Sequence, residues 1–280
     1  MDFAAMLAAE RVEMLAASAE KDTQAAFSPS APLISLGSGL SFVGCFLDRA
    51  ESARLLAAID SSFETSDWAQ LPKRRLLNLG GVPHPSGSWS ERLPGALLTV
   101  VGPRLAALGF RFDQILLNEY VAGAGISAHA DGPLFEPRAA VISLGGDAIL
   151  SFEPNEGAPG APTERAALLL REGSLAIFDG TAYTHMRHSI ADAREEAVPE
   201  YCRNSALTGV STGDIITRPH RRLSLTLRKL ARVDRYISGA DGVDEEVQRE
   251  RARRAAWWAH SISEKKAADD HQATGVNIIS

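Results

Sequence analysis

Short apolar runs separated by turn residues dominate the middle of the chain. Each run is four to six residues long, and the clearest ones cover residues 139–144, 149–152, 166–170 and 174–178. Runs of this length at this spacing predict the strands of a β-sandwich or barrel. We therefore expect a mainly β body.

Two segments before these runs have the periodicity of helices that flank a sheet. Residues 47–63 place Leu55 and Ile59 on one side, as an amphipathic helix does. Residues 93–108 are a second helical segment, in which Pro103 is expected to kink or end the helix. The predicted fold class is therefore mainly β with flanking helices.

A possible metal site is formed by His129 and Asp131, in a His-Ala-Asp triplet, together with the distant His188. Residues i and i+2 of an extended chain point to the same side, so the first two side chains can converge. Two imidazoles and one carboxylate suit a non-haem Fe(II) oxygenase, but they also suit a hydrolytic zinc site. His185 has the same chemistry as His188, and a His-X-Asp triplet is common by chance.

A strand with alternating polar residues covers Arg222 to Arg228. Arg222, Ser224 and Arg228 share one face of it. An arginine on an inward face needs an anion, and its planar fork pairs well with a carboxylate. The alternative is an outward face with two solvated arginines.

Asn118 and Tyr120 end the apolar run before His129, and they share a face if this run is a strand. Both can donate hydrogen bonds to a carboxylate. A tyrosine at a strand end also commonly packs on the core. The order Asn-X-Tyr, His-X-Asp, His and Arg-X5-Arg is much harder to obtain by chance than any of its parts.

These motifs resemble the AlkB family of Fe(II)/2-oxoglutarate-dependent dioxygenases, and most of all the branch of the sixth animal homologue. The matching stretches are residues 118–154, 180–190 and 222–233, and residues 68–93 also resemble that branch. The resemblance implies a double-stranded β-helix (jelly-roll) core. It also implies Fe(II) as cofactor, with 2-oxoglutarate and O2 as cosubstrates.

The family pattern implies roles for the residues that match it. His129, Asp131 and His188 correspond to the iron ligands, since His188-Ser-Ile fits the pattern of the distal ligand and His185 does not. The residues that correspond to cosubstrate contacts are Arg222, Asn118, Tyr120, Ser224 and Arg228. Bacterial members have asparagine in place of Ser224, and a serine reaches less far.

The resemblance also divides the chain. Residues 1–34 are expected to form a helical extension and linker, and residues 35–235 an AlkB-like dioxygenase domain. Residues 236–280 are then a helical extension and tail, whose tryptophans are expected to dock on the same chain. Within the domain, a lid is expected at about 68–90. A polar insert without periodicity, at about 192–220, is expected to project from the barrel mouth.

The implied activity is oxidative demethylation of an alkylated base in DNA or RNA, more readily in a single strand. The net charge of −6 argues against a globally basic nucleic-acid binder. A local basic cluster, Lys73-Arg74-Arg75, lies within the expected lid beside Trp68, and an aromatic ring can stack on an exposed base. A solvated loop and a core tryptophan explain the same residues equally well.

Other functions remain open at this point. The domain could bind nucleic acid or protein with restricted catalysis, or it could demethylate or hydroxylate a protein. The sequence has no apolar run of about 18 residues that would span a membrane. Its two cysteines are too few for a disulfide framework. We expect an intracellular protein of the cytoplasm, the nucleus or both.

Overall fold

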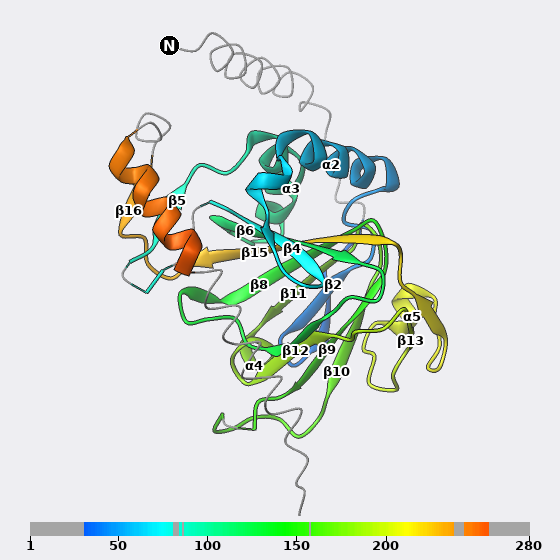
Figure 1. Cartoon of the computed structure of the whole chain (residues 1–280). Helices are drawn as coiled ribbons and strands as arrows, with labels where there is room; N and C mark the ends of the chain where they lie inside the picture. The colour runs from blue at the N-terminus through cyan, green and yellow to red at the C-terminus, as the bar shows by residue number, and fades with distance from the viewer. Residues whose placement is uncertain (1–30, 81–83, 86, 157, 238–243, 258–280) are drawn as a thin grey trace, which may run out of the picture.

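The computed structural model describes residues 31–80, 84–85, 87–156, 158–237 and 244–257 (Figure 1). Its larger sheet has the spatial order β1 (Ile34–Gly37), β2 (Leu40–Val43), β11 (Leu175–Asp179), β8 (Phe135–Leu144), β15 (Arg221–Leu230), β6 (Gln114–Val121), β4 (Arg74–Leu79) and β3 (Ala69–Gln70). The smaller sheet has the order β10 (Ala166–Leu170), β9 (Ala148–Pro154), β12 (Met186–Ile190) and β7 (Ile126–His129). Neighbouring strands within both sheets are antiparallel.

The larger sheet buries both of its faces, in two separate hydrophobic clusters. One cluster joins the sheet to the helices α2 (Arg49–Ser62) and α3 (Gly95–Ala107), which lie over it (Figure 1). The other cluster includes Phe178 of the larger sheet and Phe152 of the smaller one, so it fills the space between the sheets. The mainly β fold with flanking helices is confirmed, and the two facing sheets form a jelly-roll sandwich.

The first predicted helix is confirmed, and the second differs in one respect. Asp48 caps α2, accepting a hydrogen bond from the Glu51 backbone N–H at 2.8 Å, and Glu51 accepts one in return from the Asp48 N–H at 2.9 Å. Pro103 is expected to kink or to end the second helix. It does not end the helix, because α3 continues to Ala107. The helix buries Leu97, Val101 and Leu105, and this burial outweighs the lost backbone hydrogen bond.

The insert does not simply project from the barrel mouth, which corrects the expectation. Its short elements are β13 (Glu195–Ala197), α5 (Ser205–Thr208) and β14 (Ile215–Thr217). Its apolar side chains pack against the face of β9 and β10 that points away from the larger sheet; the cluster contains Val198, Cys202, Ile216, Ile149, Ala167 and Leu169. The insert therefore covers the outer face of the smaller sheet at β9 and β10.

Asn204 fastens this insert to β10. Its side chain is fully buried; it donates to the Leu169 carbonyl at 2.9 Å and accepts from the Leu169 N–H at 2.8 Å. Asn204→Ala leaves both backbone groups unpaired, so we expect the free energy of unfolding to fall by about 2 kcal/mol or more. The neighbouring Arg203→Ala breaks an exposed ion pair to Glu164 and should cost less than about 1 kcal/mol. Urea unfolding measures both, and equal losses would contradict the role of Asn204.

The described part of the C-terminal extension docks on the same chain, as predicted for Trp257, whereas Trp258 lies outside the described residues. The strands β16 (Arg235–Ile237) and β5 (Trp89–Glu91) pair in parallel, and residues 245–257 are helical. From this helix Arg254 donates to the Gly87 carbonyl at 2.6 Å, and the Trp257 ring lies 4.9 Å from that of His84. The predicted N-terminal helix and the final tail lie outside the described residues. Among the described helices, none is long and apolar enough to cross a membrane.

Candidate metal centre

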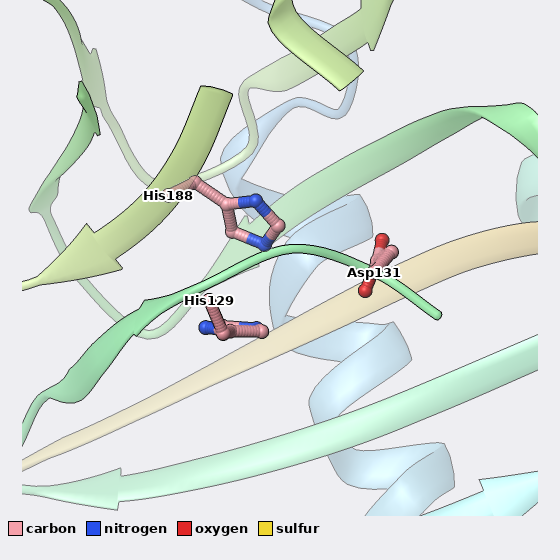
Figure 2. A group of neighbouring side chains, drawn as sticks. All are labelled: His129, Asp131 and His188. Carbon is pink, nitrogen blue, oxygen red and sulfur yellow. The ribbon is translucent and has the colours of Figure 1, made fainter. Parts of the chain in front are cut away.

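Two neighbouring strands of the smaller sheet, β7 and β12, bring His129, Asp131 and His188 together. His129 ends β7 and is the antiparallel partner of His188 on β12, and Asp131 follows two residues later. The possible ligand atoms of the three residues all lie within 4.8 Å of one another, and the imidazole centroids are 4.4 Å apart (Figure 2). The predicted triplet is thus a compact cluster of two nitrogens and one carboxylate, the donor set of non-haem Fe(II) oxygenases.

Local contacts prepare these groups for a metal. The Nδ1 of His129 lies 2.8 Å from the Ser127 carbonyl, so it donates there and leaves Nε2 to bind. Burial lowers the pKa of His188 to about 3 and also lowers the pKa of His129. Burial opposes ionisation of Asp131, but Arg228 and the two imidazoles outweigh it and lower its pKa. Neutral imidazoles and an ionised carboxylate are the protonation states that metal binding requires.

Arg228 fixes one oxygen of Asp131. Its Nη1 donates to Asp131 Oδ1 at 3.0 Å, and its Nε donates to Gln114 at 3.1 Å. Asp131 Oδ2 is buried and has no partner among the described residues. Arg228 therefore holds the carboxylate from behind and leaves its second oxygen for a metal.

A second arginine, Arg222, is buried on the same face of β15 as Arg228, which points toward the smaller sheet and is called the inner face. Arg222 on β15 lies opposite Tyr120 on β6, and its Nε donates to Ser143 Oγ at 3.0 Å. Nη1 and Nη2 are buried and have no partner within the described part of the chain. Burial lowers the pKa of Arg222 to about 10, so the group is still charged at neutral pH. Burying an unpaired cation is costly, so these two nitrogens fit an anion such as a carboxylate.

The other predicted contacts share this inner face. Asn118, Ser224 and Ser143 lie side by side across β6, β15 and β8, and all three are buried. The Oδ1 of Asn118 has no partner among the described residues. The hydroxyl of Ser143 accepts from Arg222 and donates to the Gly146 carbonyl at 3.0 Å. The triad and Arg222 together fit Fe(II) and a dicarboxylate.

Residues 49–228 match the 2OG-Fe(II) oxygenase superfamily. The chain belongs to this superfamily. Within it the chain is similar to AlkB homologues: the zebrafish (Danio rerio) protein named "Probable RNA/DNA demethylase ALKBH6" is 34% identical over 205 residues, which are 69% of this chain and 86% of that protein. The "Alkylated DNA repair protein ALKBH8 homolog" of Arabidopsis thaliana is 26% identical over 69% of this chain and 58% of its own length.

The similar solved structures are more distant in sequence. The structure of OsALKBH1 is 16% identical, with a TM-score of 0.48, over 71% of this chain and 100% of its own. The family assignment rests on the sequence matches, which confirm the AlkB-type oxygenase fold. As a member of this superfamily, the protein is a dioxygenase that uses Fe(II), 2-oxoglutarate and O2.

The structure decides which of His185 and His188, equal in their chemistry, lies in the cluster of possible ligands. His185 is not part of the cluster of ligand atoms found among the described residues. Its Nδ1 lies 2.6 Å from the Thr184 hydroxyl on the exposed side of α4 (Gly180–Thr184). His188 is buried between the sheets and faces the other two ligands.

Only part of the expected lid reaches the site. Of its basic cluster, Arg74 and Arg75 begin β4 and Lys73 lies in the bend before it, whereas residues 81–83 and 86 lie outside the described residues. Arg74 pairs with Tyr120 across the sheet, so it shares the inner face with Arg222, and its charge contributes to lowering the pKa of His129. Lys73 forms an ion pair with Asp192 of the insert.

Trp68 and Arg75 occupy the opposite side. Trp68 is only 5% exposed and packs in the cluster beneath the helices. The guanidinium of Arg75 covers the tryptophan ring at 4.5 Å and also bonds to Glu119 at 2.9 Å. The prediction that Trp68 contacts the substrate is therefore wrong, because its ring is enclosed by the core and by Arg75.

Sequence reasoning missed one polar side chain between the sheets. Tyr183, on α4, has a buried hydroxyl and lies in the cluster that contains Phe178. Its position before His188 has no periodicity or spacing that marks a site. Its residue type alone gave no signal, because a tyrosine at a turn is common.

Proposed function

We propose that this protein is an oxidative demethylase of alkylated bases in DNA or RNA. His129, Asp131 and His188 hold Fe(II), and Arg222 binds the far carboxylate of 2-oxoglutarate, with Asn118, Tyr120, Ser224 and Arg228 as further contacts. The observation that carries this proposal is the triad, bonded through Asp131 to Arg228, together with the buried guanidinium of Arg222 on the same face of β15 as Arg228. Its two terminal nitrogens lack hydrogen-bond partners among the described residues.

Bound Fe(II), with 2-oxoglutarate and O2, supplies the oxidising power to hydroxylate an N-methyl group, with succinate, CO2 and formaldehyde as products. The side chains of the protein bind and orient. Arg222 fixes the direction of the cosubstrate, and Arg228 holds Asp131 in its metal-binding position. No side chain has to remove a proton from the methyl group, since hydrogen abstraction needs no general base.

The nucleic-acid substrate is supported by the similarity to the zebrafish relative and by Arg74. This arginine is half-buried on the inner face, and its Nε lacks a partner among the described residues. It can meet a phosphate when a base approaches the metal. A base reaches a buried centre only outside the helical stack, which favours a single strand.

The test is to measure formaldehyde and succinate with methylated oligonucleotides, single-stranded and duplex, and with methylated peptides as the comparison. We expect the methylated oligonucleotides to give formaldehyde and succinate in equal amounts, and single strands to be better substrates than duplexes. Formaldehyde from the peptides alone would indicate a protein demethylase. Oligonucleotide binding without either product would indicate a binding protein with restricted catalysis.

Arg74→Gln should weaken binding of a single-stranded oligonucleotide by about 10-fold and lower the salt dependence of binding by about one phosphate contact. Arg75→Gln is the matched control, because this neighbour faces the helices and is held by Glu119 and Trp68. Fluorescence anisotropy at several salt concentrations measures both variants. Equal effects at the two positions would mean that the cluster acts only through its overall charge.

A further inference from the structure

The hydroxyl of Tyr183 is a polar group that the proposed function leaves unused. The phenol oxygen is buried, and no described residue forms a hydrogen bond with it. An unpaired buried hydroxyl costs roughly 1–3 kcal/mol, so such a group in a folded protein points to a missing partner. Tyr183 lies on α4, in the segment that leads into the strand of His188.

Ring contacts place Tyr183 beside the metal centre. Its ring stacks on Phe178, with centroids 6.0 Å apart and planes at 26°, and Phe178 lies 5.0 Å from the ring of His188. Burial raises the pKa of Tyr183, and the charge of Asp131 raises it further while Arg228 opposes it. The hydroxyl is therefore protonated at neutral pH and lies within electrostatic range of the Asp131–Arg228 pair.

Tyr183, Asp131 and Arg228, which influence one another electrostatically, each have a buried polar atom without a hydrogen-bond partner among the described residues. These atoms are the Tyr183 hydroxyl oxygen, Arg228 Nη2 and Asp131 Oδ2. The Asp131 oxygen is an acceptor that a metal satisfies. The other two are donors, and two donors beside a metal require an acceptor, best supplied by a carboxylate.

We propose that Tyr183 is a positioning residue for the cosubstrate: its hydroxyl donates a hydrogen bond to the carboxylate next to the keto group of 2-oxoglutarate, alongside Arg228. Arg222 binds the other carboxylate. The inference rests on the proposed placement of 2-oxoglutarate between Arg222 and the metal, and it holds for any methylated substrate. Tyr183, on the helix that precedes β12, would then donate to the cosubstrate together with Arg222 and Arg228 of β15.

The test is Tyr183→Phe, which removes only the hydroxyl. Binding is measured by calorimetry with Mn(II) in place of Fe(II), so that no turnover occurs. We expect 2-oxoglutarate to bind about 10-fold more weakly, the loss of one hydrogen bond to a charged group. Levulinate has the same chain and far carboxylate but a methyl group in place of the carboxylate beside the ketone. Its weak binding, followed by ligand-observed NMR, should be equal in the variant and the wild type.

Tyr201→Phe, on the exposed surface of the insert, is the control and should leave both affinities unchanged. Without ligand, the Tm of Tyr183→Phe should be unchanged or higher, because an unpaired buried hydroxyl is removed. A lower Tm, an unchanged affinity for 2-oxoglutarate, or an equal loss for levulinate would each overturn the inference. Failure of the wild type to bind 2-oxoglutarate is a separate outcome, because it would overturn the placement at Arg222 as well.

Discussion

Asp131→Asn is expected to lower 2-oxoglutarate turnover by more than about 100-fold, beyond what removal of a ligand's outer partner costs. A neutral amide is a poor ligand for Fe(II), and it also removes the charge that pairs with Arg228 at 3.0 Å. Asparagine preserves the size of the side chain and an oxygen that can accept from Arg228. The variant is therefore expected to fold, unlike one that removes the acceptor of Arg228 Nη1. Succinate formation and Mn(II) affinity are measured together.

The control for this variant is Asp179→Asn, which alters another aspartate–arginine pair. Asp179 lies 3.3 Å from Arg138, and both side chains are partly exposed. Its turnover should stay within about twofold of the wild type, since exposed pairs contribute little. Normal turnover by Asp131→Asn would contradict the ligand assignment. Reduced turnover with unchanged metal affinity would also contradict it.

Arg222→Met should have opposite effects on stability and on cosubstrate binding. The terminal nitrogens of the buried Arg222 form no hydrogen bond with a described residue, and methionine replaces this cation by an apolar side chain. Without ligand, the free energy of unfolding should therefore be unchanged or higher. The Kd of 2-oxoglutarate should rise by roughly 30-fold or more, as when one partner of a buried charge pair is removed. Calorimetry with Mn(II) and urea unfolding measure the two effects.

Arg221→Met is the matched control, one residue earlier and on the other face of β15. Arg221 bonds to Glu119 and Asp60, and its side chain is 40% exposed. This variant should lose a little stability, of about 1 kcal/mol, and bind 2-oxoglutarate normally. A destabilised Arg222→Met that still binds 2-oxoglutarate would mean that Arg222 has a structural role.

The parts of the site predicted from sequence are those set by strand geometry. Alternation along β15 places Arg222 and Arg228 on one face, because neighbouring side chains of a strand point to opposite sides. His129 is the last residue of β7, and Asp131, two residues beyond the strand, converges with it as the His-X-Asp spacing predicted. Family resemblance then selected His188 over His185, which chemistry alone could not do.

The features that sequence missed depend on tertiary contacts without a period. Val198, Cys202 and Ile216 are spaced irregularly, so nothing in the chain showed that the insert packs on the smaller sheet. Trp68 is enclosed only because Arg75 and the core cover it. Tyr183 gains its interest from the neighbouring charges of Asp131 and Arg228, which are remote in sequence.

The proposed activity depends on oxidation of 2-oxoglutarate at the His129–Asp131–His188 centre. The most direct measurement is succinate formed by purified wild type under O2 with added Fe(II), with and without methylated single-stranded oligonucleotides. We expect succinate formation that requires Fe(II), disappears when Zn(II) replaces it, and increases with the oligonucleotide. Absence of succinate in every condition, with Fe(II) and 2-oxoglutarate shown to be bound, would contradict it and leave a binding protein on an oxygenase fold.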